Sequence, residues 1–476
     1  MPDLTYRRRL LVLGICCMSL LIVSLDNTIL NVALPSMQRD FHASVSGLQW
    51  TIDAYLVVIA SLLLLSGSTA DRIGRKRVFQ TGLVLFTFGS LLCSLAPGLG
   101  WLIAFRMVQA VGGSMLNPVA MSIITNTFSD PRERARAIGV WGGVVGISMA
   151  AGPIVGGALV QSVGWRSIFW INLPVGLAAL LLTARFVPES RAPRARRVDP
   201  VGQLLVVALL GTLTYGIIEG SDAGWASAPI IGCFVVAALA VAGLVVYEPR
   251  RRDPLIDTRF FASAPFSGAT VIAVSAFAAL GGFLFLNTLY LQDQRGLSAL
   301  DAGLYMVPMA LMCLVFAPLS GRLVGNRGPR LPLVLAGAAM TASGVLFAAL
   351  DAQSSNALLF TSYVLFGIGF GLVNAPITNT AVSGMPRSQA GVAAAVASTS
   401  RQVGQSLGVA VLGAALAAGL HEGAWWIITG CGLAVLVLGV LTTGRWARGT
   451  AERTAAALMV PEADRAPDAR ATVGTS

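Results

Sequence analysis

The sequence predicts an all-α protein that crosses a membrane many times, and three observations support this fold class. Of the 476 residues, 55% are hydrophobic and only 12% are charged, whereas soluble domains carry about 25% charged residues. The apolar residues gather in runs of about 20, the length that a helix needs to span a bilayer. Basic residues fall mainly in every second segment between these runs. Together these features predict a polytopic helical membrane protein.

We expect fourteen spanning helices, because fourteen runs are long and apolar enough to cross the hydrocarbon core. They cover residues 10–33, 49–70, 78–97, 100–123, 135–160, 168–187, 200–219, 229–247, 266–290, 301–323, 331–350, 357–382, 389–418 and 424–444.

The positions of the basic residues test this count. With the first residues placed in the cytoplasm, Lys and Arg gather in the segments on that side of the fourteen spans. The exceptions are Arg39, Arg166 and Arg295 in the opposite loops and Arg106 and Arg401 inside spans. We therefore expect a multi-pass protein of the cytoplasmic membrane with both termini inside. The net charge of +11 then reflects topology and lipid contact rather than nucleic-acid binding.

The two halves of the chain also repeat. Gly67 and Gly74, seven residues apart, are echoed by Gly321 and Gly328 in the second half. Paired six-helix bundles with the substrate site between them are typical of transporters. The predicted organisation is a cytoplasmic segment at 1–9, a six-helix bundle at 10–190, a two-helix linker pair at 199–248, a second six-helix bundle at 264–444 and a disordered cytoplasmic tail at 445–476.

The composition gives little support to an enzyme or a metal protein. The only histidines, His42 and His421, lie near predicted helix ends, and all six cysteines fall inside apolar runs. The sequence has no phosphate-binding G-x-x-x-x-G-K-[ST] loop and no evident nucleophile–base pair. We therefore expect no catalytic residues, no metal and no cofactor. A membrane-embedded enzyme or receptor without transport remains the alternative class.

Three charged side chains lie inside the first, second and fourth spans, at a similar depth. These are Asp26, Asp53 and Arg106. An isolated charge in a membrane costs several kcal/mol unless it faces water or a partner. Arg106 can neutralise a carboxylate and lock two helices together, which is the structural interpretation. The functional interpretation is proton transfer by a carboxyl group that titrates near physiological pH.

Residues 67–77 form a short basic segment, GSTADRIGRKR, between two spans. A cytoplasmic anchor needs only polarity and positive charge, so its glycines and its acidic residue require another explanation. The segment resembles the loop after the second helix of major facilitator superfamily transporters, with the pattern G-x-x-x-D-R-x-G-R-[KR]. The matching residues are Gly67, Asp71, Arg72, Gly74 and Arg75. We expect Asp71 to close the cytoplasmic side through charge contacts that break in the other state.

The fifth span carries a second resemblance. Its run G-P-x-x-G-G resembles the fifth-helix motif of the antiporters in this superfamily, with Pro153 interrupting the helix hydrogen bonds. The motif residues are Gly146, Gly152, Pro153, Gly156 and Gly157. Residues 25–35, LDNTILNVALP, resemble the first-helix segment of drug–proton antiporters, in which this aspartate and a fourth-helix arginine are linked to proton coupling. The resemblance implies that Asp26 takes up the proton and that Asp53 or Arg106 tunes its affinity.

The resemblance covers nearly all of residues 10–444 and implies a fourteen-span drug–proton antiporter that acts as a monomer. It would export a hydrophobic or amphiphilic compound in exchange for protons by alternating access. The alternatives are an exporter of a specific metabolite or self-made antibiotic, and a proton symporter. Two intramembrane carboxylates permit a cationic substrate, but neutral compounds are as plausible if both carboxylates are committed to protons and Arg106.

Candidate contacts in the substrate cavity are polar or adaptable side chains in spans around the centre of the two bundles, although for each of them taken singly helix packing is the favoured explanation. They are Asn27, Asn31, Gln109, Met115, Asn117, Asn287, Asn374, Asn379 and Arg401. Arg401 lies near the middle of its span, where a brace between helices and a place in the cavity are equally compatible with the sequence.

Overall fold

The structure is a computed structural model that describes residues 5–192, 198–251, 254–351, 353–386 and 389–459. These residues form helices joined by short turns, and no strand occurs among them. Thirteen helical segments in this part of the chain are long and apolar enough to cross a membrane. The all-α multi-span fold class predicted from the sequence is therefore confirmed.

The first bundle contains six spans. Ser44 caps the second span by accepting a hydrogen bond from the N–H of Gly47, and Asp130 caps the fifth through the N–H groups of Arg132 and Glu133. A short helix precedes the sixth span. The helices are α1 (Tyr6–Phe41), α2 (Val45–Ile73), α3 (Arg75–Ser94), α4 (Leu99–Thr127), α5 (Pro131–Ser162), α6 (Ser167–Trp170) and α7 (Asn172–Phe186).

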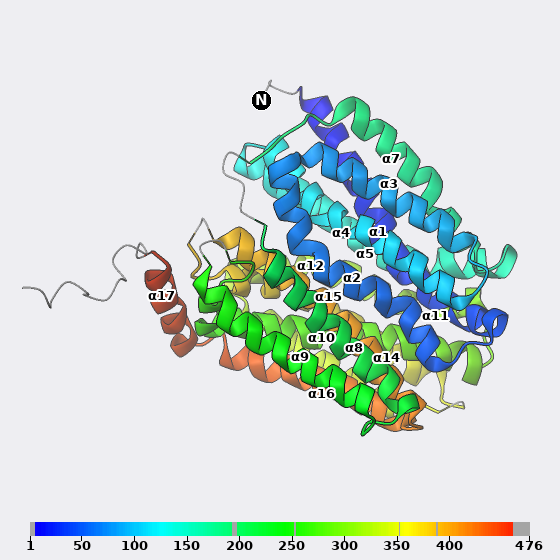
Figure 1. Ribbon diagram of the computed structural model, residues 1–476. Helices are drawn as coiled ribbons and strands as arrows, with labels where there is room; N and C mark the ends of the chain where they lie inside the picture. Colours follow the sequence, from blue (N-terminus) through cyan, green and yellow to red (C-terminus); the bar gives the residue numbers. More distant parts are fainter. Residues whose placement is uncertain (1–4, 193–197, 252–253, 352, 387–388, 460–476) are drawn as a thin grey trace, which may run out of the picture.

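The linker pair and the second bundle follow. The linker pair is α8 (Pro200–Ala223) and α9 (Ala228–Tyr247), followed by the short helices η1 (Glu248–Arg250) and η2 (Thr258–Ala262). The second bundle contains α10 (Ala264–Leu289) with the π-helical turn η3 (Tyr290–Gln294), α11 (Ala299–Tyr305), α12 (Val307–Arg327), α13 (Arg330–Ala348), α14 (Asn356–Val382), α15 (Ala390–Ala417) and α16 (His421–Leu441). Figure 1 shows the two bundles side by side.

The thirteenth predicted span, at 389–418, corresponds to α15, which is a helix of 28 residues. It is not among the thirteen segments that qualify as spans by apolarity, because Arg401, Gln402 and Gln405 make its sequence more polar. Nevertheless α15 packs along α10 of its own bundle and along α2 of the first bundle. Its polar residues therefore belong to a helix inside the assembly of spans.

The prediction of a disordered tail from Arg445 was wrong for its first part, because Arg445–Met459 forms the helix α17. Ala and Arg favour helices, and the small side chains of Ala447 and Ala451 are buried. Thr450 Oγ1 accepts a hydrogen bond from the N–H of Ala264 at 2.9 Å, which ties α17 to the start of α10. Residues 460–476 lie outside the described residues.

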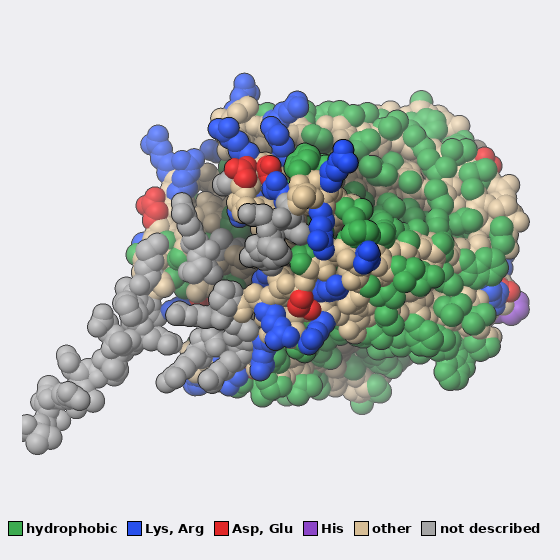
Figure 2. Space-filling model, turned by 90° about the horizontal axis from the view of Figure 1, so that it is seen from above, with side chains coloured by type: hydrophobic (Ala, Val, Ile, Leu, Met, Phe, Trp, Pro, Cys, Tyr) green, Lys and Arg blue, Asp and Glu red, His purple; other side chains and the backbone are tan. Residues whose placement is uncertain are grey.

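The two bundles meet closely at one end of the molecule, where α1 ends and α2 begins. The Gln49 side chain of α2 donates hydrogen bonds to the carbonyl groups of Val409 and Ala410 of α15 at 3.0 and 2.8 Å. Gln292 Nε2 donates to the Val32 carbonyl at 2.9 Å. We call this the closed end. The other end, where α1 begins and α2 ends, carries most of the described Lys and Arg side chains, and we call it the basic end (Figure 2).

The linker pair is attached to the first bundle by hydrogen bonds from both ends of α8. Glu219 accepts from Trp50 Nε1 at 2.7 Å, and Gln203 Nε2 donates to the Ser61 carbonyl at 2.6 Å. Helix α8 also packs against α15 of the second bundle. It therefore covers one side of the seam between the bundles.

Candidate functional site

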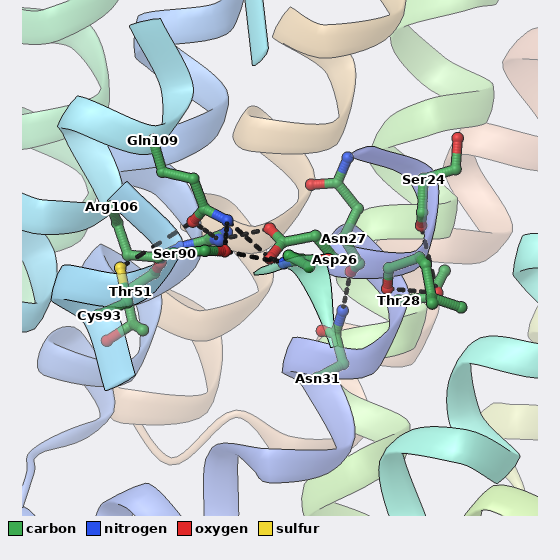
Figure 3. Close-up of polar contacts among 12 residues, drawn as sticks. Ser24, Asp26, Asn27, Thr28, Asn31, Thr51, Ser90, Cys93, Arg106 and Gln109 are labelled. Carbon is green, nitrogen blue, oxygen red and sulfur yellow. Dashed lines mark hydrogen bonds and ion pairs between the residues drawn. The ribbon is translucent and has the colours of Figure 1, made fainter. Parts of the chain in front are cut away.

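Asp26 lies at the centre of a buried polar network that joins four helices (Figure 3). Its Oδ2 accepts from Arg106 Nη1 at 2.5 Å, and the two side chains are 3% and 1% exposed. Its Oδ1 accepts from Gln109 Nε2 at 2.9 Å and from Asn172 Nδ2 at 3.0 Å. Ser90 Oγ accepts from both amides. The carboxylate thus has donors on both oxygens, which is the condition for burying a charge at acceptable cost.

Arg106 links this network to α2. Its Nε donates to the Thr51 carbonyl at 3.3 Å, and its guanidinium lies 4.1 Å from the ring centre of Tyr55. Gln109 Oε1 accepts from Nη1 at 2.7 Å. Arg106 is therefore the partner of Asp26 and contacts α2 on both sides of Asp53 in the sequence.

Asn172 and Ser90 were not predicted as members of this site. Each supplies hydrogen bonds from a different span, and an isolated Asn or Ser in an apolar helix gives no signal of its partner. Asn172 lies within the segment INLP at the start of α7, and its polarity alone does not identify its partner.

Asp53 is also fully buried, but neither of its carboxylate oxygens has a hydrogen-bond partner among the described residues. It comes from the face of α2 that also carries Gln49, which is one helical turn away and bound to α15. The nearby polar group is the Ser406 hydroxyl of α15, which lies close enough to interact with the carboxyl, although neither group makes a well-formed hydrogen bond. Asp53 therefore lies unpaired at the interface between the bundles.

A cavity of about 680 Å³ lies between the bundles on the side of the basic end. Its wall comes from α2, α4 and α5 of the first bundle, from α14 and α15 of the second, and from the segments that flank the linker pair. The charged and amide side chains of the wall are Asp71, Asn117, Asp199 and Arg401, and most of the remaining wall is apolar. The size is typical of small-molecule sites, which occupy about 300–1,000 Å³.

Two of the predicted cavity candidates, Asn117 and Arg401, line this cavity. Gln109 belongs to the Asp26 network instead. The Asn31 amide donates to the Asn27 carbonyl within α1, and the Asn287 side chain accepts from the Tyr363 hydroxyl.

The remaining candidates are Met115, Asn374 and Asn379. Met115 packs against Gly82 of α3. The Asn374 carbonyl accepts from the Thr378 hydroxyl at 3.4 Å, and the Asn379 side chain is exposed. The contact with Gly82 places Met115 in helix packing, and the Asn374 residue is partly buried.

The basic loop after α2 is bound to its own half of the molecule. Asp71 Oδ1 pairs with Arg75 Nη2 at 2.8 Å, and the Asp71 carbonyl accepts from the N–H of Ala192. Gly74 has φ = 127°, which explains the glycine at the turn, whereas Gly67 has no atom within contact distance that requires one. Among the described residues, Asp71 makes no ion pair across the bundles, and Arg72 is exposed.

The antiporter-like motif of α5 lies against α1 and against the second bundle. Gly152 and Gly156 face Thr28 and Ile29 of α1, and Gly146 faces α12. Pro153 lies inside α5, and its carbonyl approaches Gly303 of α11.

Gly157 makes a close approach across the bundles. A Cβ at this position would lie 2.5 Å from the Ala299 carbonyl oxygen of α11, so only glycine allows this packing at the closed end.

Comparison with solved structures supports the fold. The crystal structure of a bacterial homologue of the human lysosomal transporter Spinster, in an inward-facing and unoccupied conformation, aligns with a TM-score of 0.63 and 19% identity. The alignment covers 95% of this chain and 99% of that chain.

Relatives with much closer sequences are resistance proteins. The multidrug resistance protein Stp of Mycobacterium tuberculosis is 38% identical over 414 residues, which cover 87% of this chain and 77% of that protein. The tetracenomycin C resistance and export protein of Streptomyces glaucescens is 38% identical over 400 residues, which cover 83% and 74%. The sequence profile of the Major Facilitator Superfamily matches residues 16–409. With its two bundles and central cavity, the chain belongs to the Major Facilitator Superfamily of transporters.

Proposed function

We propose that this protein is a proton-coupled antiporter of the cytoplasmic membrane that exports hydrophobic or amphiphilic drugs or antibiotics by alternating access. The names of the relatives support drug and antibiotic efflux. The positive-inside rule assigns the basic end to the cytoplasm, so both termini lie inside and the cavity opens inward. Transport uses the proton gradient and needs no cofactor, and a single chain carries the complete cavity.

The unpaired, buried carboxyl of Asp53 at the closed interface carries this proposal. An ionised carboxylate without donors in a membrane costs several kcal/mol. We therefore infer that Asp53 holds a proton in the inward-open conformation. When α2 and α15 separate at the closed end, this group becomes accessible from outside, where it exchanges protons with that solution.

Arg106 gives a route from Asp53 to the rest of the site. Because Arg106 binds the Thr51 carbonyl and stacks on Tyr55, a movement of α2 on protonation or deprotonation of Asp53 alters its geometry. The Asp26–Arg106 pair then changes together with the α2–α15 interface. In this proposal Asp26, Asp53 and Arg106 form one coupling system, and the exchanging proton resides on Asp53.

The loop after α2 forms the gate on the cytoplasmic side. In the inward-open state Asp71 pairs with Arg75 on its own loop. Closing the cavity brings the end of α14 and the start of α15 toward α2, and Asp71 then exchanges partners with groups of the second bundle. The α5 motif serves the opposite side, where Gly157 packs on α11.

The test is proton release from purified protein reconstituted in liposomes when a panel of lipophilic cations, anions and neutral antibiotics is added. The wild type should release protons on binding a transported compound. Asp53→Asn should abolish this release because it removes the exchanging group. Asp26→Asn should reduce transport while proton release by the remaining Asp53 persists.

Glu452→Gln is the matched control, because Glu452 is an exposed carboxylate on α17, away from the cavity. It should behave as the wild type. Undiminished proton release in Asp53→Asn would contradict the assignment of the exchanging proton. Binding of compounds without proton release in the wild type would contradict antiport itself.

A further inference from the structure

Arg401 is a charged side chain in the cavity wall that has no ionic partner. Its Nη2 donates to Thr378 Oγ1 of α14 at 2.5 Å, and its guanidinium lies 5.9 Å from the ring centre of Phe277. Its Nε is buried without a hydrogen-bond partner. None of the salt bridges found among the described residues includes Arg401. Of the five N–H donors of a guanidinium, those of Nη1 make no hydrogen bond among the described residues and are available to a ligand.

The carboxylates near the cavity are committed to other groups. Asp71 pairs with Arg75 at 2.8 Å. Asp199 accepts from the N–H of Gly202 at 3.0 Å and from the Tyr247 hydroxyl at 3.2 Å, and Arg251 Nε lies 3.8 Å from its second oxygen.

The two intramembrane carboxylates do not neutralise the wall either. Asp26 is enclosed by its four-helix network, and Asp53 lies in the closed interface, outside the cavity wall. The uncompensated charge of the described wall is therefore positive and is located at Arg401.

We propose that Arg401 binds an anionic oxygen group of the transported compound. The substrates are then amphiphiles that carry a carboxylate, an enolate or an ionised phenol beside an apolar body. Arginine is suited to this role because its planar donors bind such oxygens in a bidentate manner. This inference rests on the proposed export function and specifies the substrate class of the same cavity.

The rest of the wall suits the apolar part of such a compound. Leu63, Leu64, Met121 and Trp141 supply apolar contact area, and methionine adapts to ligands of different shape. Of the substrate charges that the sequence left open, the cavity favours the negative one, because it holds an unpaired guanidinium and no unpaired carboxylate side chain among its described residues.

The test uses three fluorescent probes that share one dansyl group and a chain of similar length. They are N-dansyl-6-aminohexanoic acid, which is anionic, its neutral primary amide, and the cationic dansylcadaverine. Binding to the purified full-length protein is titrated in one detergent at one ionic strength. The wild type should bind the acid about tenfold or more tightly than the amide, and the cation most weakly. Arg401→Gln should remove this order.

Thr378→Val is the matched control, because it removes the hydrogen-bond partner of Arg401 but leaves the guanidinium. If Arg401 recognises the anion, Thr378→Val keeps the preference for the acid, and Arg401→Lys keeps a reduced preference. If Arg401 only braces α15 against α14, Arg401→Gln and Thr378→Val lower the binding affinity for all three probes equally. That result overturns the proposal. Equal binding of the three probes to the wild type, or preference for the cation, also overturns it.

These outcomes are separate from those that test export. Proton release evoked by neutral or cationic compounds, without preference for the acid, would preserve the antiporter and reject the anionic substrate class. Loss of proton release with an intact preference for the acid would reject coupling and preserve the binding site. The wild-type titration alone decides the proposal if the Arg401 variants do not fold.

Discussion

Asp26 and Asp53 are buried carboxylates on consecutive helices, and their surroundings are opposite. Asp26 accepts hydrogen bonds from Arg106, Gln109 and Asn172, so both of its oxygens have donors. Asp53 has no ion-pair partner and no well-formed hydrogen bond among the described residues, and it lies near the Ser406 hydroxyl of the second bundle. A satisfied ion pair holds helices of one bundle together, whereas an unpaired carboxyl at a movable interface can respond to protonation. On this difference rests our proposal that Asp26 has a structural role in coupling and that Asp53 exchanges the proton.

The largest expected effect is the loss of the Asp26 partner. Arg106→Met leaves a buried carboxylate without its charge partner, and breaking such a pair costs about 3–5 kcal/mol. We expect the free energy of unfolding in detergent to fall by this amount, with a lower thermal midpoint. The measurement is a denaturant or thermal unfolding curve of the purified variant beside the wild type.

The double variant Asp26→Asn with Arg106→Met is the control for that prediction. It removes both charges, so it should regain a large part of the lost stability. If the free energy of unfolding of the double variant falls by the sum of the decreases measured for the two single variants, Asp26 and Arg106 do not interact as described.

The second prediction concerns the closed end. Gly157→Leu places a side chain where the Ala299 carbonyl now lies, and overpacking of this kind costs about 1–3 kcal/mol. The variant should therefore populate the state in which the closed end is open. In a cysteine-free background, labelling of Asp53→Cys by a thiol reagent from outside should become several-fold faster, and labelling of Asp26→Cys should change much less.

Gly321→Leu is the matched control for Gly157→Leu, because no atom lies within 4 Å of a Cβ at this position on α12. It should leave both labelling rates unchanged. Equal acceleration at positions 26 and 53 would show that the two carboxylates become accessible together and would remove the contrast between them.

The third prediction is a small change in stability on neutralising Asp53. Asp53→Asn has the same shape and no charge, and no hydrogen bond of the carboxylate is lost. The free energy of unfolding should remain within about 1 kcal/mol of the wild type, even though proton release is abolished. A loss comparable to that of Arg106→Met would mean that Asp53 is ionised and paired in the folded protein.

The sequence predicted the spans because each apolar run carries its own evidence of length and flanking charge. It identified Asp26, Asp53 and Arg106 as functional candidates because charges are rare inside spans. It could not decide which carboxylate pairs with Arg106, because this depends on the rotation of three helices about their axes. Asn172 and Ser90 were missed for the same reason. The helix α17 was missed because an Ala- and Arg-rich polar segment is compatible with either a disordered tail or a helix packed on a partner.

The smallest expected effect on stability is at the loop after α2. The Asp71–Arg75 pair joins the end of α2 to the start of α3 and is partly exposed, and exposed pairs contribute about 0.2–1 kcal/mol. Asp71→Asn should therefore unfold almost as the wild type does. If Asp71 is a gate residue, the variant should nevertheless slow transport, because the effect lies in closing the cavity and not in the inward-open state. Stopped-flow transport measured beside thermal unfolding separates these effects: slow transport with unchanged stability supports a gate, and wild-type transport limits Asp71 to a local ion pair.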